Sequence, residues 1–333
     1  MRPLAVLASG MVTSVGPTAP ASCAAIRAAV RGIADTRFMD RGGEWIRGGA
    51  VPLDTPVRGR EKLLELAVSA IGECLPPGKV PVLLCLPEAE RPGRLDGLDE
   101  SLLWELAKRL KADFHEHSMV FADGRVAGAQ ALRRAEQLVH ESKHPRVVVA
   151  GVDTFLVGPT LAAYEKRERL MTSRNSDGFL PGEAAAAVAL GPAESGALLC
   201  VGIGFGTEKA FGGSGEPLRG DGLLEAARAA LADAGTTFDA IDYRISDACG
   251  EQYGMKEAAL VVGRGLRQRK TTFPIWQPAE CLGEVGAATV PVALAVALAA
   301  ARKDYAPGPG VLCHVSGDDG ARAAIVLRKE GGA

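Results

Sequence analysis

Several features that would assign a sequence to a common functional class are scarce here. The 333 residues carry a formal net charge of only −2. This near balance argues against nucleic acid, or an anionic membrane surface, as the main partner. The basic run over residues 264–270 is a local exception, and short runs of this kind are usually solvated surface. With 47% hydrophobic and 23% charged residues, the chain has ample material for a globular core.

Cysteine is scattered rather than paired. The seven cysteines lie far apart without a CxxC pair, so neither a disulfide framework nor a zinc site is indicated. Some lie in apolar runs, as in Val82-Leu-Leu-Cys85, where a free cysteine packs as a small hydrophobic residue. We expect no metal and no cofactor. The sequence opens on the strand-like run RPLAVLASGMVTSVG without a charged leader and cleavage site, which favours the cytoplasm.

One apolar stretch has nearly the length of a membrane span. Val285 to Ala301 is apolar all round, but it is slightly short of the roughly 20 residues that a span needs, and it contains Pro291. A helix that is apolar on every face also suits the buried centre of a large globular protein. We therefore predict a core helix and no membrane partner.

Short apolar runs alternate with longer helical patterns, which predicts an α/β fold with a layered sheet. The order helix, strand, glycine turn, strand occurs twice and indicates a duplicated unit, with halves at 1–192 and 197–333. Strands are expected at 4–7, 80–86, 146–152, 184–190, 198–203, 243–246, 310–315 and 323–327. Helices are expected at 20–31, 61–73, 101–110, 127–141, 222–234, 255–264 and 287–303.

The most informative stretch is SRNSDGFLPGEAAAAVAL, residues 173–190. Gly178 and Gly182 allow backbone conformations that are closed to other residues, which predicts a tight loop that leads into a buried strand. Loops of this chemistry often border an active site.

This stretch and several others resemble the β-ketoacyl synthases, the condensing enzymes of the thiolase-like superfamily. SDGFLPGEAAAAVAL is similar to the family's Arg-Asp-Gly-Phe-x-x-Gly-Glu-Gly-Ala signature, and VVVAGVDTF to the strand and turn after its nucleophile helix. ALADAGTTFDAIDYRISDACG, CLGEVGAATVPVALAVAL and VLCHVSGDDGARAAIVL resemble its later segments. The resemblance implies a thiolase-like five-layered αβαβα fold of two similar halves, usually dimeric.

The resemblance also implies where catalytic groups belong, and each of these positions has changed. The nucleophilic cysteine falls at Asp123 or Gly124, and no cysteine occurs between 86 and 199. The first histidine falls in the run from Ser246 to Glu251, which includes Cys249, and the second falls at Glu284. The lysine falls at Pro278-Ala279, and the flexible phenylalanine loop is replaced by Ser316–Gly320, with Asp318 and Asp319.

We therefore expect no catalytic residues, although the family's activity would be that of an acyltransferase of fatty acid or polyketide synthesis. The expected role is binding, as a partner of an active condensing enzyme or as an adaptor or assembly protein. A homodimer or a heterodimer with a related condensing enzyme is expected, and an acyl carrier protein is a further candidate partner.

The alternative is an acyl-thioester transferase or hydrolase with a site rebuilt around Cys249, Cys281 or His314, because a cysteine and a histidine within reach can form a nucleophilic pair. The carboxylates near the former pocket must be solvated, paired or metal-bound, and solvated loops are favoured. These are Asp123, Glu251, Glu284, Asp318 and Asp319. Glu257 resembles the glutamate near the family's lysine and is expected to be structural. His115 and His117 have metal-like spacing on a strand, but a pair without a third ligand is more often surface.

Two structural expectations follow. Segments 10–16, 123–125, 177–183, 246–251, 283–284 and 316–320 should converge around one cavity. The strand from His117 to Ala122 should form the dimer contact, because its apolar residues lack polar alternation and an uncovered edge of this kind invites aggregation.

Overall fold

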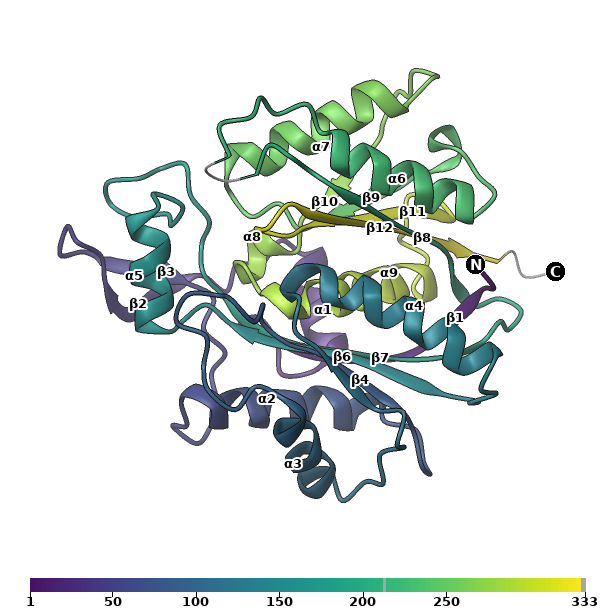
Figure 1. The fold of residues 1–333 in the computed structure, drawn as a ribbon, viewed down its shortest axis with the longest axis horizontal. Helices are drawn as coiled ribbons and strands as arrows, with labels where there is room; N and C mark the ends of the chain where they lie inside the picture. Colours follow the sequence, from purple (N-terminus) through teal and green to yellow (C-terminus); the bar gives the residue numbers. More distant parts are fainter. Residues whose placement is uncertain (212–213, 331–333) are drawn as a thin grey trace.

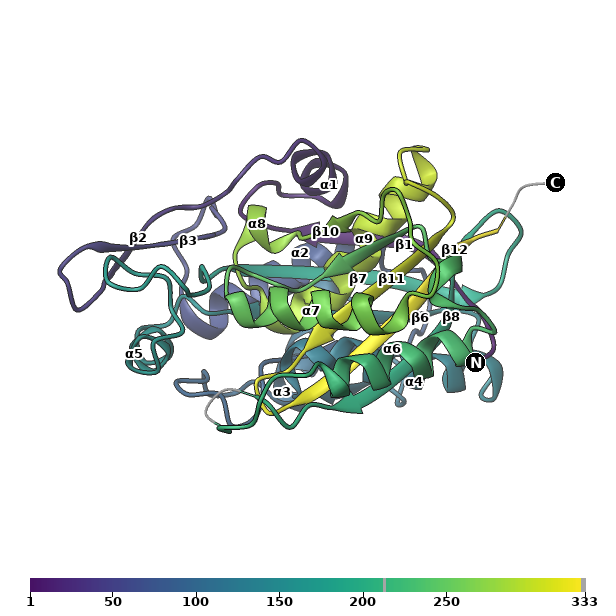
Figure 2. The same cartoon turned by 90° about the horizontal axis from the view of Figure 1, so that it is seen from above.

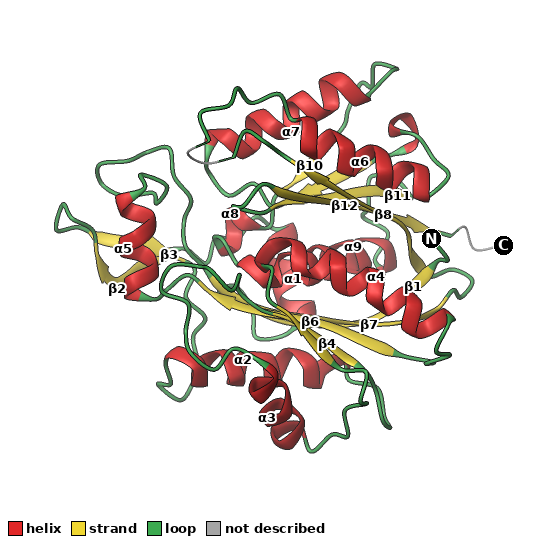
Figure 3. Cartoon of the chain, viewed as in Figure 1, coloured by secondary structure: helices red, strands yellow, loops and turns green. Residues whose placement is uncertain are grey.

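Two layers of β-strands are covered by helices above, between and below them (Figures 1 and 3). The structure is a computed structural model, and it describes residues 1–211 and 214–330. The outer helices on one side are α6 (Asp221–Asp233) and α7 (Gln252–Gly265), and those on the other side are α2 (Gly59–Cys74) and α3 (Glu100–Leu110). Between the strand layers lie α1 (Ala19–Arg27), α4 (Ala127–His140) and α9 (Thr289–Arg302). The five expected layers are confirmed.

The two halves of the chain repeat one strand arrangement. In the first half the order is β1, β7, β6, β4, β5, and in the second half it is β8, β12, β11, β9, β10. In both halves the first two pairings are antiparallel and the last two are parallel. The strands are β1 (Leu4–Val12), β4 (Val82–Cys85), β5 (Met119–Phe121), β6 (Val147–Thr154), β7 (Glu183–Pro192), β8 (Leu198–Thr207), β9 (Tyr243–Ser246), β10 (Ile275–Trp276), β11 (Gly310–Ser316) and β12 (Ala321–Lys329).

The two arrangements are joined through β1, which pairs with β7 along its length and with β8 at residues 4–6. All ten strands thus form one hydrogen-bonded sheet, with β5 and β10 at its two edges. The predicted division of the chain between 192 and 197 falls in the connection from β7 to β8, and it stays a prediction.

The helix α9 in the middle layer is almost entirely buried, because a strand layer covers each side of this layer. Eleven residues of α9 are buried, which agrees with the predicted core helix. Gly128 of α4 lies so close to Val290 of α9 that a side chain on Gly128 would collide with it. Within the described residues, no helix combines the length and the apolar character that a membrane crossing requires.

The loop before β7 is tight for a reason other than the expected one. Neither Gly178 nor Gly182 has a positive φ, so the prediction of a special backbone conformation is wrong. The space around these residues is what requires glycine. A Cβ on Gly178 would lie 2.5 Å from the Leu170 carbonyl carbon, and a Cβ on Gly182 would overlap the Leu282 carbonyl oxygen. The strand that follows is buried from Glu183 to Gly191, as predicted.

A smaller unit projects from one end of the molecule (Figure 2). It consists of the two-stranded sheet of β2 (Ala34–Met39) and β3 (Trp45–Gly48), together with α5 (Gly158–Lys166). The aromatic rings of Phe155, Tyr164 and Phe179 pack against one another at its base. Tyr164 thereby carries its hydroxyl toward the loop that follows β11, where it donates a hydrogen bond to Asp318.

Candidate functional site

Four loops from different parts of the chain meet around the side chain of Arg125. Arg125 lies in the 3-10 turn η1 (Gly124–Val126), which leads into α4. The loop after β9 brings Asp247, the turn after α8 (Ala279–Leu282) brings Glu284, and the loop after β11 brings Ser316 and Asp318. These loops share one end of the sheet because β9 and β11 are adjacent parallel strands.

Arg125 is only 7% exposed, and oxygen atoms surround its guanidinium group. Nη2 lies 2.9 Å from a Glu284 carboxylate oxygen and 3.7 Å from Asp318. Nη1 donates to the Ser316 carbonyl at 2.9 Å and lies 3.9 Å from Asp247. Burial alone would lower the pKa of Arg125, but Glu284 and Asp318 outweigh it and raise the pKa well above its usual value. The group is therefore a permanent buried cation.

A second arginine extends this network toward the solvent. Arg169 forms two parallel hydrogen bonds with the Glu251 carboxylate, both 2.8 Å long, and a third contact with Asp318 at 2.8 Å. Bidentate pairs of this kind are geometrically specific. The hydroxyl of Tyr164 also donates to Asp318, at 2.8 Å. Burial would raise the pKa of Asp318, but Arg125 and Arg169 hold it below its usual range.

A third arginine closes the network beneath the loop after β11. Arg322 is 1% exposed, and its Nε donates to Glu257 at 2.8 Å. Glu257 also accepts from the Ser316 hydroxyl at 3.0 Å, and Arg322 donates to the Tyr253 hydroxyl at 2.9 Å. Burial raises the pKa of Glu257, although Arg322 opposes the shift. Glu257 thus lies where it can hold the loop.

An open cavity of about 190 Å³ is lined by both the arginines and the carboxylates of this network, namely Arg125, Arg169, Arg322, Asp247, Glu251 and Asp318. Cys249 is the thiol on this wall. Burial raises the pKa of Cys249 well above its usual value, and the nearby Glu284 raises it further. Because the thiolate is the nucleophilic form, this environment disfavours reaction at Cys249.

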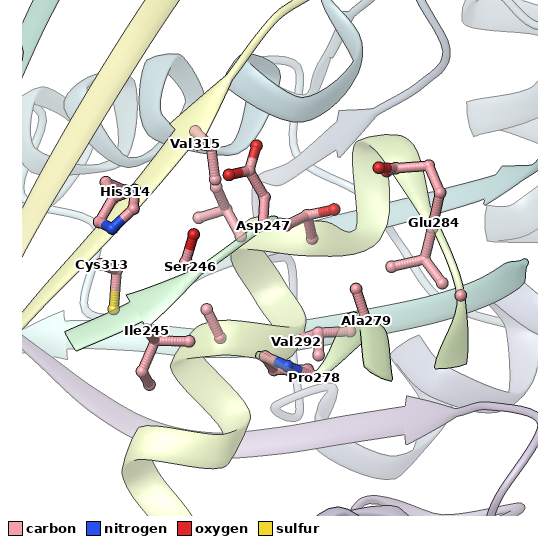
Figure 4. A pocket seen from close by; sticks show the side chains of 15 residues that line it. Ile245, Ser246, Asp247, Pro278, Ala279, Glu284, Val292, Cys313, His314 and Val315 are labelled. Carbon is pink, nitrogen blue, oxygen red and sulfur yellow. The ribbon is translucent and has the colours of Figure 1, made fainter. Parts of the chain in front are cut away.

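His314 lies on β11 in a second, smaller space of about 20 Å³, which also touches Ser246, Cys313 and Glu284 (Figure 4). This volume is about that of one water molecule. Burial lowers the pKa of His314 to about 3, and the charge of Arg244 adds to the shift. Its Nδ1 has no hydrogen-bond partner among the residues that the structure describes. His314 is thus a neutral, enclosed imidazole.

Asp123 and Gly124 lie where the chain enters η1. Burial raises the pKa of Asp123, and the exposed Asp319 raises it further. Gly124 has a φ of +54°, and a side chain on it would overlap the Glu88 carboxylate. Cys281 lies elsewhere: it lines a separate cavity with Ile26, Trp276 and Tyr305. The structure therefore does not bring Cys281 into the cavity around Arg125.

Three of the six segments expected to converge, 123–125, 246–251 and 316–320, line this cavity, and Glu284 of the segment 283–284 contacts Arg125. The segment 177–183 packs against two of the others without lining the cavity: the Leu180 carbonyl accepts from the Glu284 amide at 2.7 Å, and Gly250 packs against the Gly178 carbonyl. The segment 10–16 packs elsewhere. Gly10 packs against Ala70 of α2 and Gly16 packs against Ser22 of α1, and the described lining of the cavity includes none of this segment. The prediction is wrong for residues 10–16 because their turn is used to pack these two helices.

No role was predicted from the sequence for Arg125, Arg169, Asp247 or Arg322, which line the cavity, or for Tyr164, which donates to Asp318. Arg125 carried a detectable signal, because it is a lone charge at the start of the otherwise small and apolar run VAGAQAL. Its partners are distant in sequence and become neighbours only through the fold.

Comparison with known proteins places this geometry in a wider context. No protein-family profile and no curated protein matches the sequence. Solved structures do match. A chain of the ketosynthase in complex with its chain length factor from Xenorhabdus doucetiae is 13% identical, with a TM-score of 0.79 and 98% of each chain covered. A chain of the complex of a type II polyketide synthase acyl carrier protein with its hexaketide-bound ketosynthase is 16% identical, with a TM-score of 0.81 and coverage of 98% and 99%.

A third match is the ketosynthase from module 6 of the bacillaene synthase of Bacillus subtilis 168, with 12% identity and a TM-score of 0.76 over 99% of this chain and 72% of that one. The protein therefore has the thiolase-like α/β fold. Over nearly its full length, its structure matches the folds of ketosynthases and of ketosynthase–chain length factor complexes. At these identities, the matches establish the fold.

Proposed function

We propose that this protein is a catalytically inactive ketosynthase-like protein that acts by binding. Its partner is an active condensing enzyme, or another protein for which it serves as an adaptor or assembly factor. The observation that carries the proposal is the ion pair between Arg125 and Glu284. The resemblance assigns the nucleophilic cysteine to the turn that holds Arg125 and the second histidine to Glu284, and here a buried salt bridge joins the two places.

The surrounding network supports this role. Breaking a buried ion pair by removing one partner is strongly destabilising, because the other charge stays buried without compensation. Arg125, Asp318 and Arg169 share partners, so a substrate that separated them would have to replace several contacts together. These ion pairs therefore stabilise the loops at this end of the sheet.

The alternative, a rebuilt nucleophilic site, has weaker support. A cysteine nucleophile requires a lowered pKa or an adjacent base, whereas the pKa of Cys249 is raised. His314, with a pKa near 3, would be a weak general base at neutral pH. Cys281 lines a different cavity, and burial raises its pKa too.

The edge strand β5 is the proposed binding surface. It pairs with β4 on one side only, and Met119 is 38% exposed. The Phe121 carbonyl accepts from the Leu86 amide on the β4 side, so the backbone groups of the neighbouring Val120 point to the open side. Exposed strand edges invite pairing with another chain. Two of the matched structures are described as complexes of a ketosynthase with a chain length factor, and one as a complex with an acyl carrier protein.

The proposal is tested by incubating the protein with a reactive acyl thioester and measuring its intact mass. We expect no covalent adduct after a time that fully labels an active condensing enzyme. A variant with Cys249→Ser controls for slow labelling of the half-buried thiol. Stoichiometric acylation of the wild type that is lost in the Cys249→Ser variant would establish the rebuilt site instead.

A further inference from the structure

Three of the five histidines of the chain come together beside the edge strand β5. The ring centroids of His115, His117 and His144 lie 4.4 to 5.2 Å apart. One ligand nitrogen from each ring lies within 4.8 Å of the other two. The sequence had indicated only the pair at 115 and 117. His144, which supplies the third ring, is 27 positions after His117, in the connection from α4 to β6.

His115 and His117 do not lie on a strand, although the sequence had predicted one there. The Ser118 amide donates to the His115 carbonyl at 2.8 Å, which closes a turn just before β5. In a strand, alternate side chains would share a face but stay parallel, whereas this turn lets both rings converge. The expectation was wrong because the turn shortens the strand to Met119–Phe121.

Backbone hydrogen bonds fix both segments that carry the rings. The His115 amide donates to the Val80 carbonyl at 3.0 Å, and the His144 amide donates to the Leu138 carbonyl at 3.0 Å. Lys143, just before His144, has a φ of +60°, in the left-handed region that non-glycine residues seldom adopt. This residue turns the chain so that His144 faces the other two.

Two of the ring nitrogens already lie near the spacing of neighbouring zinc ligands. His117 Nδ1 and His144 Nε2 are 2.9 Å apart. In a tetrahedral zinc site with bonds of 2.0–2.1 Å, two ligand nitrogens are about 3.3 Å apart. A small outward shift of these rings would therefore admit an ion. His115 Nδ1 accepts a hydrogen bond from the His117 amide at 3.1 Å, and a metal on this nitrogen would replace that bond.

The chemistry of the three side chains narrows the choice of ion. Imidazole binds metal through a ring nitrogen in its neutral form. A cluster of three imidazoles suits zinc, copper or nickel rather than calcium or magnesium, which prefer oxygen ligands.

We propose that His115, His117 and His144 form a binding site for a divalent transition metal, with zinc as the expected ion. All three rings are half-buried, so solvent can reach the fourth coordination position. The ion ties the turn before β5 to the connection after α4, and it thereby anchors the start of the edge strand. This site is independent of the function proposed above.

The test uses the full chain after treatment with a chelator. Titration with Co²⁺ should give the visible absorption of a four-coordinate ion with one equivalent bound, and Zn²⁺ should displace it. His144→Asn and His117→Asn should each weaken Zn²⁺ binding at least about 10- to 100-fold, which is the loss seen even for residues that only support a ligand. His140→Asn is the matched control, because His140 lies at the end of α4 outside the cluster, and it should bind as the wild type does.

Three results would overturn the proposal. One is a wild type that binds neither ion at micromolar concentration, and another is an unchanged affinity in both the His144→Asn and the His117→Asn variants. The third is a thiolate-to-cobalt absorption band that Cys249→Ser removes, since this would place the ion at the half-buried cysteine instead. If one histidine variant fails to fold, the other gives the same comparison.

Discussion

Asp247 has the most unusual charge environment of the residues around Arg125. Burial raises the pKa of Asp247 to about 7, the positive charge of Arg125 lowers it, and Glu284 raises it again. Its carboxylate also accepts from the Ser316 amide at 2.7 Å. The folded protein therefore binds a proton at Asp247 at pH values where the unfolded chain has released it.

This shift predicts a pH-dependent loss of stability. Because the folded pKa is above the unfolded one, the stabilising contribution is complete below about pH 4 and is lost as the pH rises through 7. Asp247→Asn mimics the protonated form. We expect the free energy of unfolding of the variant, relative to wild type, to increase by about 4 kcal/mol between pH 4 and pH 8. Urea unfolding at both pH values measures this change.

The exposed Asp96 provides a control for this experiment, since Asp96→Asn should shift stability equally little at both pH values. A constant difference between Asp247→Asn and wild type across the range would mean that Asp247 is ionised throughout.

At the residue scale, the sequence predicted which residues lie near the cavity, but not which side chains they contact. Asp123, Cys249, Glu284 and Asp318 were expected near one cavity, and the structure places all four around Arg125 or its turn. Arg169 could not be anticipated as the partner of Glu251, because 82 residues separate the two and no local pattern links them. Cys281 was expected near the same cavity, but it lies in α8 and lines a different one with Trp276 and Tyr305.

At the scale of elements, the open edge of β5 is the feature that a single substitution can test most directly. Val120→Pro removes a backbone donor that points to the open edge, while a proline on an edge strand leaves the pairing with β4 intact. If two copies pair through β5, wild type should be a dimer in light scattering and this variant should be mainly monomeric. Val120→Thr keeps the donor and should stay dimeric. A wild type that is a monodisperse monomer at micromolar concentration would contradict self-pairing.

Many elements were predicted closely from the sequence, and others were missed. The strand at 243–246 was placed to the residue, and α2, α3, α4 and α6 to within two residues at each end. The elements β2, β10, α5 and α8 were not predicted. Their formation depends on tertiary contacts, such as the stacking of Trp276 on Tyr243 at 4.5 Å between centroids.

At the scale of the whole molecule, α4 of the first half packs against α9 of the second half. Gly128→Ala should lower the free energy of unfolding by about 1–3 kcal/mol, because the added methyl group overpacks the contact with Val290. Gly263→Ala is the matched control. Gly263 lies in α7 with open space around its Cα, so alanine should be neutral or stabilise by up to about 1 kcal/mol. Equal effects of the two variants in urea unfolding would show that the α4–α9 contact is loosely packed.

The overall architecture could be predicted because it depends on the succession of helices and strands along the chain, and not on particular side-chain contacts. The repeated succession of helix, strand, turn and strand indicated a duplication, and both halves have the same strand order. The hydrogen bonds from β1 to β8 that merge the two layers into one sheet could not be predicted, since they join only residues 4–6 to 198–200.

The two ends of this sheet differ in a way that limits how many copies can assemble. Two copies joined edge to edge through β5 would leave their β10 strands outermost. Each β10 is two residues long, and Pro274 and Pro278 flank it closely, so it offers almost no template for a further strand. Growth would therefore stop at a closed pair related by a two-fold axis, and the continuous sheet would not extend into a fibre.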